Sequence, residues 1–411
     1  MQKESCNIAL LDDPSSDKTI VYLPLDDYAV LADKAEVPKI LADLSQKRID
    51  KPQRKIYWKP KDVEGLRSLM ILPNNKCNFH CSYCYSANGR TNEEIDPAVL
   101  EAGLRYFLHP DRAKGERLSV SVLGGGEPLL SWNILRPALE KAMPMLEQRQ
   151  TPCPISLVTN GSVCTDEIIQ FCLRHQISLS VSFDILEDVQ NAQRGAWDIV
   201  SANINRFTQA GLDVALNTVI SNNNVERMSE MIEHLAKYNP GVKKVSFKTM
   251  ISKRHFSDRE ERRKYYREFI RNFFQAKTLA DEYGIYLTCS YMNACLCVTD
   301  RYCQGKFVIT SEGDISICHT VGSKRDELYD KFIFGHIDHQ TGEVSIDKDK
   351  LQAILSYDVS QRDECAECPA RWHCAGGCYA DHFHLSGEDR QLYCESMRVF
   401  LAAFLKYRYK L

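Results

Sequence analysis

The sequence predicts an α/β protein, in which a partial (β/α)6 barrel of the TIM type is followed by a small cysteine-rich domain. From residue 68 to residue 284, short apolar runs alternate with amphipathic stretches, a pattern typical of parallel strands joined by helices. Beyond Gly284 this alternation stops, and cysteines, glycines and short apolar pieces dominate as far as Cys394. Such a composition is expected of a domain that is held by metal rather than by an apolar core.

The barrel strands are expected where β-branched or apolar residues cluster and, in most cases, turn residues follow. They fall at 69–73, 118–123, 155–159, 179–183, 214–219 and 245–250. Amphipathic segments at 96–107, 133–146, 165–174, 197–210, 225–238 and 258–283 predict the helices. Because active sites of such folds lie at the carboxyl ends of the strands, functional residues are expected there.

The two ends of the chain have different patterns. Near the N-terminus, 19–23 is expected to be a strand, 37–44 a helix and 51–61 a basic linker that contains proline. The last segment is expected to be a closing helix. The predicted divisions are an α+β extension at 1–66, the barrel at 67–284, the cysteine-rich domain at 285–395 and the C-terminal helix at 396–411.

Composition excludes several classes of protein. The net charge of −3 over 411 residues gives no argument for binding nucleic acid or an anionic membrane. No apolar run approaches the roughly 20 residues of a membrane span, and the first sixteen residues lack the pattern of a signal peptide. A cytoplasmic protein is therefore expected. In that reducing compartment, seventeen cysteines point to metal binding or catalysis rather than to disulfides.

A first cysteine array follows the first barrel strand: Cys77, Cys81 and Cys84 in the spacing C-x3-C-x2-C. Three thiolates suit a [4Fe–4S] cube with one iron left open for a second molecule. A structural zinc site, the alternative, normally has four protein ligands.

Polar motifs end the next barrel strands. The turn 124–128 reads Gly-Gly-Gly-Glu-Pro and contains Gly125, Gly126 and Glu127. Glycines permit close approach of the backbone to a ligand, and the carboxylate can accept a hydrogen bond from an ammonium group. Further candidates at the strand ends are Asn160, Ser182, Asp184, Arg194 and Asn217.

Together, these motifs resemble those of the radical S-adenosylmethionine (radical SAM) superfamily. The resemblance implies that the open iron binds SAM and that reductive cleavage of SAM yields a 5′-deoxyadenosyl radical, which abstracts hydrogen. It places Tyr83 beside the adenine and the Gly-Gly-Glu-Pro turn at the SAM amino group. Ser182 and Arg194 would meet the SAM carboxylate or ribose. Many relatives have glycine after the aspartate of the fourth strand, where this chain has Ile185, so the local turn is expected to differ.

The second array contains eight cysteines, enough for two fully ligated clusters: Cys297, Cys303, Cys318, Cys365, Cys368, Cys374, Cys378 and Cys394. Its paired C-x2-C also resembles a zinc ribbon. The complete spacing is similar to that of the SPASM domain. That resemblance implies one auxiliary [4Fe–4S] cluster on Cys297, Cys303, Cys318 and Cys378. It implies a second on Cys365, Cys368, Cys374 and Cys394. Six other cysteines fit no array: Cys6, Cys153, Cys164, Cys172, Cys289 and Cys295.

Within this family, two functions are consistent with the sequence. The first is maturation of a ribosomally made precursor peptide by a thioether or carbon–carbon crosslink, with a flavodoxin- or ferredoxin-type electron donor. The second is the anaerobic sulfatase maturase, in which an aspartate after the third auxiliary cysteine acts as a base. Here that position is His319, which is either a base or a structural histidine and which favours the first function. A non-catalytic metal-binding scaffold is the alternative from another class. The N-terminal extension is a candidate contact for a leader peptide, through an exposed strand edge.

Overall fold

The computed structural model describes residues 8–12, 16–46, 59–250 and 255–411. Cys6 and most of the expected linker at 51–61 lie outside the described residues. Among the helices of the described ranges, none is both long and apolar enough to cross a membrane.

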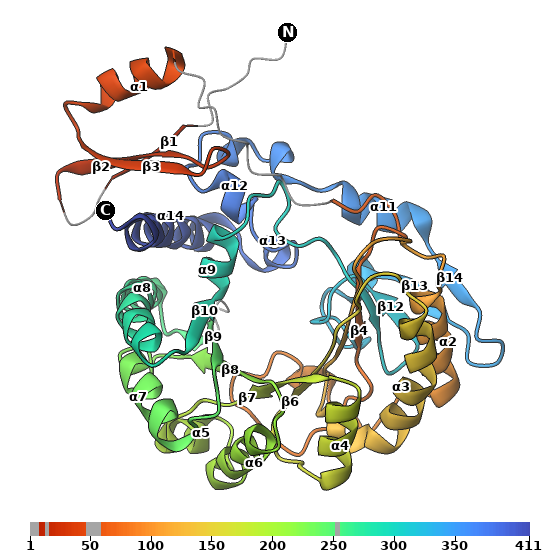
Figure 1. Ribbon diagram of the computed structural model, residues 1–411. Helices are drawn as coiled ribbons and strands as arrows, with labels where there is room; N and C mark the ends of the chain where they lie inside the picture. The colour runs from red at the N-terminus through yellow and green to blue at the C-terminus, as the bar shows by residue number, and fades with distance from the viewer. Residues whose placement is uncertain (1–7, 13–15, 47–58, 251–254) are drawn as a thin grey trace.

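A curved sheet of eleven strands forms the centre of the molecule, and helices cover its outer face (Figure 1). Its barrel part contains six parallel strands in sequence order, which confirms the predicted α/β fold. These are β4 (Ser68–Ile71), β5 (Ser119–Val122), β6 (Ile155–Thr159), β7 (Ser178–Ser182), β8 (Val214–Ile220) and β9 (Lys244–Thr249). The helices are α2 (Pro97–Leu108), α3 (Trp132–Glu147), α4 (Asp166–Arg174), α5 (Glu187–Gln193), α6 (Trp197–Gln209), α7 (Met228–Tyr238) and α8 (Arg259–Glu282).

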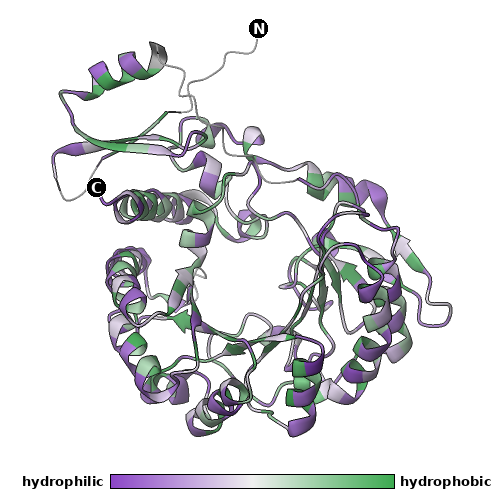
Figure 2. Ribbon diagram, in the orientation of Figure 1, coloured by the Kyte–Doolittle hydropathy of each residue, from purple (hydrophilic) through white to green (hydrophobic). Residues whose placement is uncertain are grey.

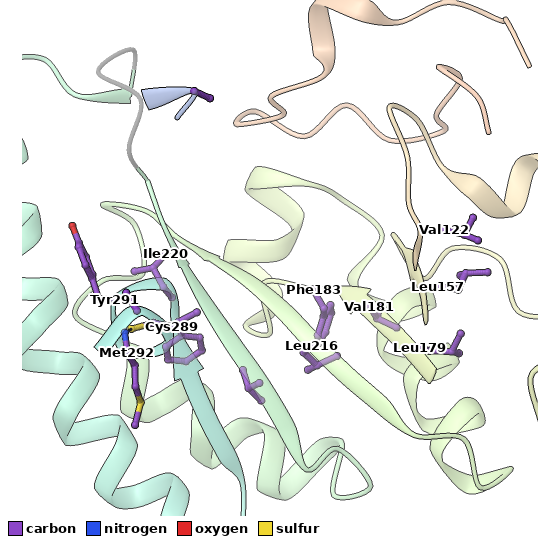
Figure 3. Packing of buried hydrophobic residues seen from close by; sticks show 14 of the residues in the cluster. Val122, Leu157, Leu179, Val181, Phe183, Leu216, Ile220, Cys289, Tyr291 and Met292 are labelled. Carbon is purple, nitrogen blue, oxygen red and sulfur yellow. Dashed lines mark hydrogen bonds between the residues drawn. The ribbon is translucent and has the colours of Figure 1, made fainter. Parts of the chain in front are cut away.

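Strand β7 shows why these segments form a two-faced sheet. Its sequence Ser-Leu-Ser-Val-Ser alternates half-buried serines with buried Leu179 and Val181, and successive side chains of a strand point to opposite faces. Val181 lies near Val200 of α6, so the apolar face packs on the helices and the serines line the inner face. Figure 3 shows this packing for labelled residues of β5 to β8. Burying one such side chain stabilises the fold by about 1.5–3 kcal/mol.

Local signals set where the helices begin. The Asp96 carboxylate accepts a hydrogen bond of 2.7 Å from Ala98 N ahead of α2, and Pro97 occupies its first position. Thr165 and Asp258 cap α4 and α8 in the same way. Such caps satisfy backbone donors that have no partner within the helix. Hydrophobic residues then face the sheet and hydrophilic residues face outward (Figure 2).

Beyond the barrel the sheet continues in both directions. On one side, β10 (Tyr286–Cys289) pairs parallel with β9. On the other, β11 (Phe307–Ile309) pairs parallel with β4, and β12 (Asp314–Ser316), β13 (Ile333–Ile337) and β14 (Val344–Ile346) follow antiparallel. The cysteine-rich segment is therefore hydrogen-bonded directly to the first barrel strand. Strands β11, β12 and β14 have only three residues each, too few to show a periodicity in the sequence.

The N-terminal extension is a three-stranded antiparallel sheet with one helix. It contains β1 (Ala9–Asp12), β2 (Lys18–Leu23), β3 (Tyr28–Asp33) and α1 (Val37–Gln46), so the expected strand and helix are both present. The closing helix α14 (Gly387–Tyr409) begins before residue 396 and contains Cys394. The extension lies beside α14 and α12 (Arg371–Cys374) (Figure 1). There the Tyr22 hydroxyl bonds to His373 Nε2 at 2.9 Å and the Asp27 carboxylate pairs with Arg408 at 2.8 Å.

Candidate active site

The first cysteine array lies in the loop that follows β4, at the carboxyl ends of the barrel strands. Cys81 and Cys84 are joined by a backbone turn, with 3.2 Å between Cys84 N and Cys81 O. Hydrogen-bond donors surround the thiols: Arg90 Nη2 lies 3.2 Å from Cys84 Sγ, and Asn160 Nδ2 lies 3.8 Å from Cys77 Sγ. Donors of this kind tune a bound cluster.

The glycine turn of residues 124–126 packs directly against this loop. A Cβ on Gly126 would lie 1.8 Å from Lys76 O, and a Cβ on Gly125 would lie 2.3 Å from Asn75 Oδ1. Only glycine permits this approach. The Ser86 hydroxyl also donates to Gly125 O at 2.6 Å, so the turn and the cysteine loop form one rigid unit.

Glu127 connects that unit to the third barrel strand. Its Oε1 accepts from Thr159 Oγ1 at 2.7 Å and from Leu129 N at 3.1 Å, while Oε2 accepts from Asn160 N at 2.6 Å. Burial raises the pKa of Glu127, and these hydrogen bonds oppose that rise. Oε2 has this one donor among the described residues, so it retains capacity to accept from a ligand ammonium.

Buried Asp184 and half-buried Tyr83 and Arg194 form a network next to the thiols. The Tyr83 hydroxyl donates to Asp184 Oδ2 at 2.6 Å and accepts from Arg194 Nη1 at 3.0 Å. Gln193 Nε2 and Val219 N also donate to the Asp184 carboxylate. Burial raises the pKa of Asp184, and the Arg194 charge opposes this effect. Arg194 also lowers the pKa of Cys81, although burial raises that pKa overall. The network therefore brings a guanidinium group close to the first array.

Replacing Tyr83 by phenylalanine should destabilise the protein by about 2 kcal/mol. The change removes one donor to the buried Asp184 carboxylate and one acceptor for Arg194, and hydrogen bonds to charged groups contribute about 1.5–3 kcal/mol each. Anaerobic thermal unfolding of the purified protein measures the effect. Tyr283→Phe is the matched control, since Tyr283 is 46% exposed. Equal melting temperatures for the two variants would contradict the role of the network.

The turn after Asp184 carries backbone strain. Ile185 has a φ of 65°, a left-handed conformation that glycine adopts easily and β-branched residues rarely adopt. Its side chain is fully buried, and its carbonyl accepts from Trp197 Nε1 at 2.7 Å. Ile185 therefore takes a glycine-like backbone conformation without being glycine. Such strain costs about 1–3 kcal/mol and is concentrated at functional sites.

Ser182 and Asn217 lie opposite each other on β7 and β8. The Asn217 amide donates to Ser180 Oγ at 2.6 Å, so a serine further back along β7 holds its side chain. Both predicted residues belong to the inner, polar face of the barrel at its carboxyl end.

The auxiliary cysteines form two neighbouring groups. In the first, burial raises the pKa of Cys378 to about 12, with further contributions from Asp381, Cys318 and Cys303. Cys303, Cys318 and Cys378 therefore lie close together. Cys297 is close to Cys295, which is also near Cys374. The Cys297 carbonyl bonds to His373 Nδ1 at 2.6 Å.

The second group is the set predicted for the other cluster. Burial raises the pKa of Cys374, and the nearby thiolates of Cys394, Cys368 and Cys365 add to it. All four line one cavity together with Arg362, His382 and Arg390. Within the described ranges, no three or more His, Cys, Asp or Glu side chains are arranged as ligands of a metal ion.

His319 lies between the first array and the first auxiliary group. Its ring meets the Tyr85 ring edge-on, with 6.1 Å between centroids. Burial, with the charges of Lys306 and Lys248, lowers the pKa of His319 to about 3, so the imidazole is neutral near neutral pH. Its Nδ1 is buried and has no hydrogen-bond partner among the described residues.

The sequence analysis missed several basic residues near the arrays, among them Arg90, Lys248 and Lys306. Lys248 lies on the half-buried face of β9, where it alternates with buried Val245 and Phe247, which is a weak signal that a charged group faces inward. Arg90 and Lys306 follow Cys84 and Cys303 at short distances along the chain, but neither spacing forms a known pattern.

A barrel with a thiol triad at its open end and further thiol groups beside it defines a class of iron–sulfur enzymes. Residues 71–275 of the chain match the radical SAM superfamily. The chain belongs to this superfamily and is an enzyme with a radical SAM domain and SPASM-type architecture, for which SAM and a [4Fe–4S] cluster are the implied cofactors.

Relatives and solved structures agree with this assignment. The serine-type anaerobic sulfatase-maturating enzyme of Klebsiella aerogenes is 24% identical over 366 residues, which cover 80% of this chain and 84% of that protein. The structure of anSMEcpe with bound AdoMet has a TM-score of 0.65 at 18% identity, covering 84% of this chain and 96% of that one. Streptococcus suis SuiB bound to precursor peptide SuiA has a TM-score of 0.54 at 14% identity, covering 94% and 97%. At these identities the structural matches establish the shared fold.

Proposed function

We propose that this enzyme binds SAM on a [4Fe–4S] cluster held by Cys77, Cys81 and Cys84, and abstracts hydrogen from a peptide substrate. The observation that carries the proposal is the packing of the thiol loop on the glycine turn at the carboxyl ends of the strands. Three soft thiolate ligands fit such a cluster, and charged and amide groups beside them can donate hydrogen bonds to it. When bound, the cluster and SAM supply a 5′-deoxyadenosyl radical.

The residues around the triad have distinct roles in this proposal. Glu127 Oε2, which can accept a further hydrogen bond, holds the SAM amino group together with the backbone of Gly125 and Gly126. Ser182 and Arg194 bind its carboxylate or ribose, and Tyr83 lies beside the adenine. Asn160, Asp184 and Asn217 position these groups, as their hydrogen bonds indicate.

Two auxiliary [4Fe–4S] clusters are part of the proposal. The first takes Cys297, Cys303, Cys318 and Cys378. The second takes Cys365, Cys368, Cys374 and Cys394, which line one cavity that Cys378 of the first group also lines. Four thiolates leave no open iron, so these clusters serve electron transfer or anchoring rather than substrate binding.

We propose a ribosomally made precursor peptide as the substrate and a thioether or carbon–carbon crosslink as the product. Streptococcus suis SuiB, which has been solved with its precursor peptide SuiA, shares the fold described here over 97% of its own chain. The crosslink requires loss of one hydrogen atom to the radical. As the new bond forms, one proton and one electron are also lost, and an oxidised auxiliary cluster would accept the electron. A flavodoxin- or ferredoxin-type protein is the proposed electron donor.

His319 bears on the choice between two products. Its unpartnered Nδ1 is free to accept a proton, but a pKa of about 3 makes the imidazole a weak base near neutral pH. A maturase of sulfatases is expected to have an aspartate at this position. The Klebsiella relative, similar over 80% of this chain, nevertheless favours the second candidate, oxidation of a Cys or Ser to formylglycine. Strand β3, which among the described residues pairs only with β2 in the N-terminal sheet, is the proposed contact for a leader peptide. A cytoplasmic location is proposed because cluster ligands must stay reduced.

Anaerobic purification and a peptide assay test the proposal. We expect about twelve irons per chain for three cubes and formation of 5′-deoxyadenosine from SAM with dithionite. A precursor peptide encoded beside this gene should lose the mass of two hydrogens on co-expression. Oxidation of serine to formylglycine gives the same mass change, so a hydrazide that captures aldehydes separates the two products. Zinc in place of iron would exclude the enzymatic function.

A further inference from the structure

Lys306 is the basic residue in closest contact with a thiol of the first auxiliary group. Its Nζ lies 3.5 Å from Cys303 Sγ and donates a hydrogen bond to it. The backbone holds the residue in place, because Lys306 N donates to Ile317 O at 3.3 Å, one residue before Cys318. The side chain is half-buried, so solvent screens its charge only in part.

The charge of Lys306 acts on three thiols of one group. The thiolates of Cys303, Cys318 and Cys378 all interact favourably with the ammonium group. In the part of the chain that the structure describes, no carboxylate forms an ion pair with it. The ammonium charge is therefore directed at the thiols.

The charge of nearby Arg301 also interacts with the Cys303 thiolate, but its hydrogen bonds go to backbone carbonyls. Its Nε donates to the carbonyl of Cys303, and its Nη1 donates to the carbonyls of Ile354, Leu355 and Tyr357. Arg301 thus holds the backbone of the surrounding loops, whereas Lys306 contacts sulfur.

We propose that Lys306 is a positioning residue that stabilises the reduced form of the auxiliary cluster on Cys297, Cys303, Cys318 and Cys378. Reduction by one electron makes the cluster more negative, and both a hydrogen bond to sulfur and a nearby positive charge favour the added electron. The inference rests on the proposed cluster assignment. Lys306 thereby determines which of the two auxiliary clusters is reduced first.

The test is a potentiometric titration with dithionite, followed by electron paramagnetic resonance of the full chain. Replacing Cys77, Cys81 and Cys84 by alanine in every variant leaves the signals of the two auxiliary clusters. In Lys306→Gln we expect one midpoint potential to fall by about 59 mV, which corresponds to a tenfold change in the equilibrium constant of a one-electron reduction. The other potential should stay constant, and Lys306→Arg should restore the first.

Lys324→Gln is the matched control, because this lysine of the same domain is 69% exposed and pairs with Glu312. It should move neither potential. Lys306→Met is a second charge-free variant, in case the glutamine variant loses iron. Unchanged potentials with full iron content, or loss of about four irons in both charge-free variants, would overturn the role of Lys306. If the parent chain already lacks auxiliary iron, the proposed cluster assignment fails instead.

Discussion

Replacing Cys77, Cys81 and Cys84 together by alanine should abolish the formation of 5′-deoxyadenosine from SAM. The iron content should fall from about twelve to about eight per chain, because one cube has four irons. The expected loss of turnover is at least a thousandfold, since no other group described here could hold SAM at an iron. Product analysis under dithionite and an iron and sulfide assay measure both effects.

Cys153→Ala is the control for this experiment. Cys153 is a half-buried thiol that belongs to neither array, and burial raises its pKa to about 11. Its removal should leave iron content and SAM cleavage unchanged. If the triple variant still cleaves SAM, or the control loses iron, the assignment of the first array is wrong.

Replacing Cys368 by alanine should remove about four irons and destabilise the cysteine-rich domain by several kcal/mol. The second auxiliary group lines a cavity near short helices and turns, where the apolar core is small. Binding energy at a structural metal site is folding energy for the segment around it. Iron analysis and limited proteolysis under anaerobic conditions measure the loss, with cleavage expected within 359–386.

Cys164→Ala is the matched control here, since this half-buried thiol lies outside both arrays. It should keep about twelve irons and resist proteolysis. Full iron content in Cys368→Ala would show that Cys368 is not a ligand. Loss of iron with unchanged proteolysis would show that the cluster does not support the fold.

The barrel was predictable because each of its strands satisfies a local rule. β7 alternates serine with Leu179 and Val181, and helices α2, α4 and α8 begin at capping residues that the sequence displays. Strand β11 obeys no local rule of this kind. Its partner β4 lies more than two hundred residues away along the chain, so its pairing arises from the tertiary fold.

The residues of the candidate site likewise fall into those that the sequence indicates and those that only the folded structure brings together. The cysteines could be proposed as cluster ligands because such ligands recur at fixed spacings. The glycine turn was recognisable because close approach of the backbone excludes side chains. The Tyr83–Asp184–Arg194 network and the contact between Lys306 and Cys303 depend on segments that meet only after folding. A single arginine or lysine in the sequence gives no indication of its partner.

The pairing of β11 with β4 limits how the enzyme can open. β4 leads directly into the loop of Cys77, and β11 begins just after Lys306, so one ladder of backbone hydrogen bonds connects the first thiol site to the auxiliary one. A hinge between the two would have to break this ladder. We therefore expect the distance between the first cluster and the nearer auxiliary cluster to stay constant through turnover, while loops and the substrate move around them.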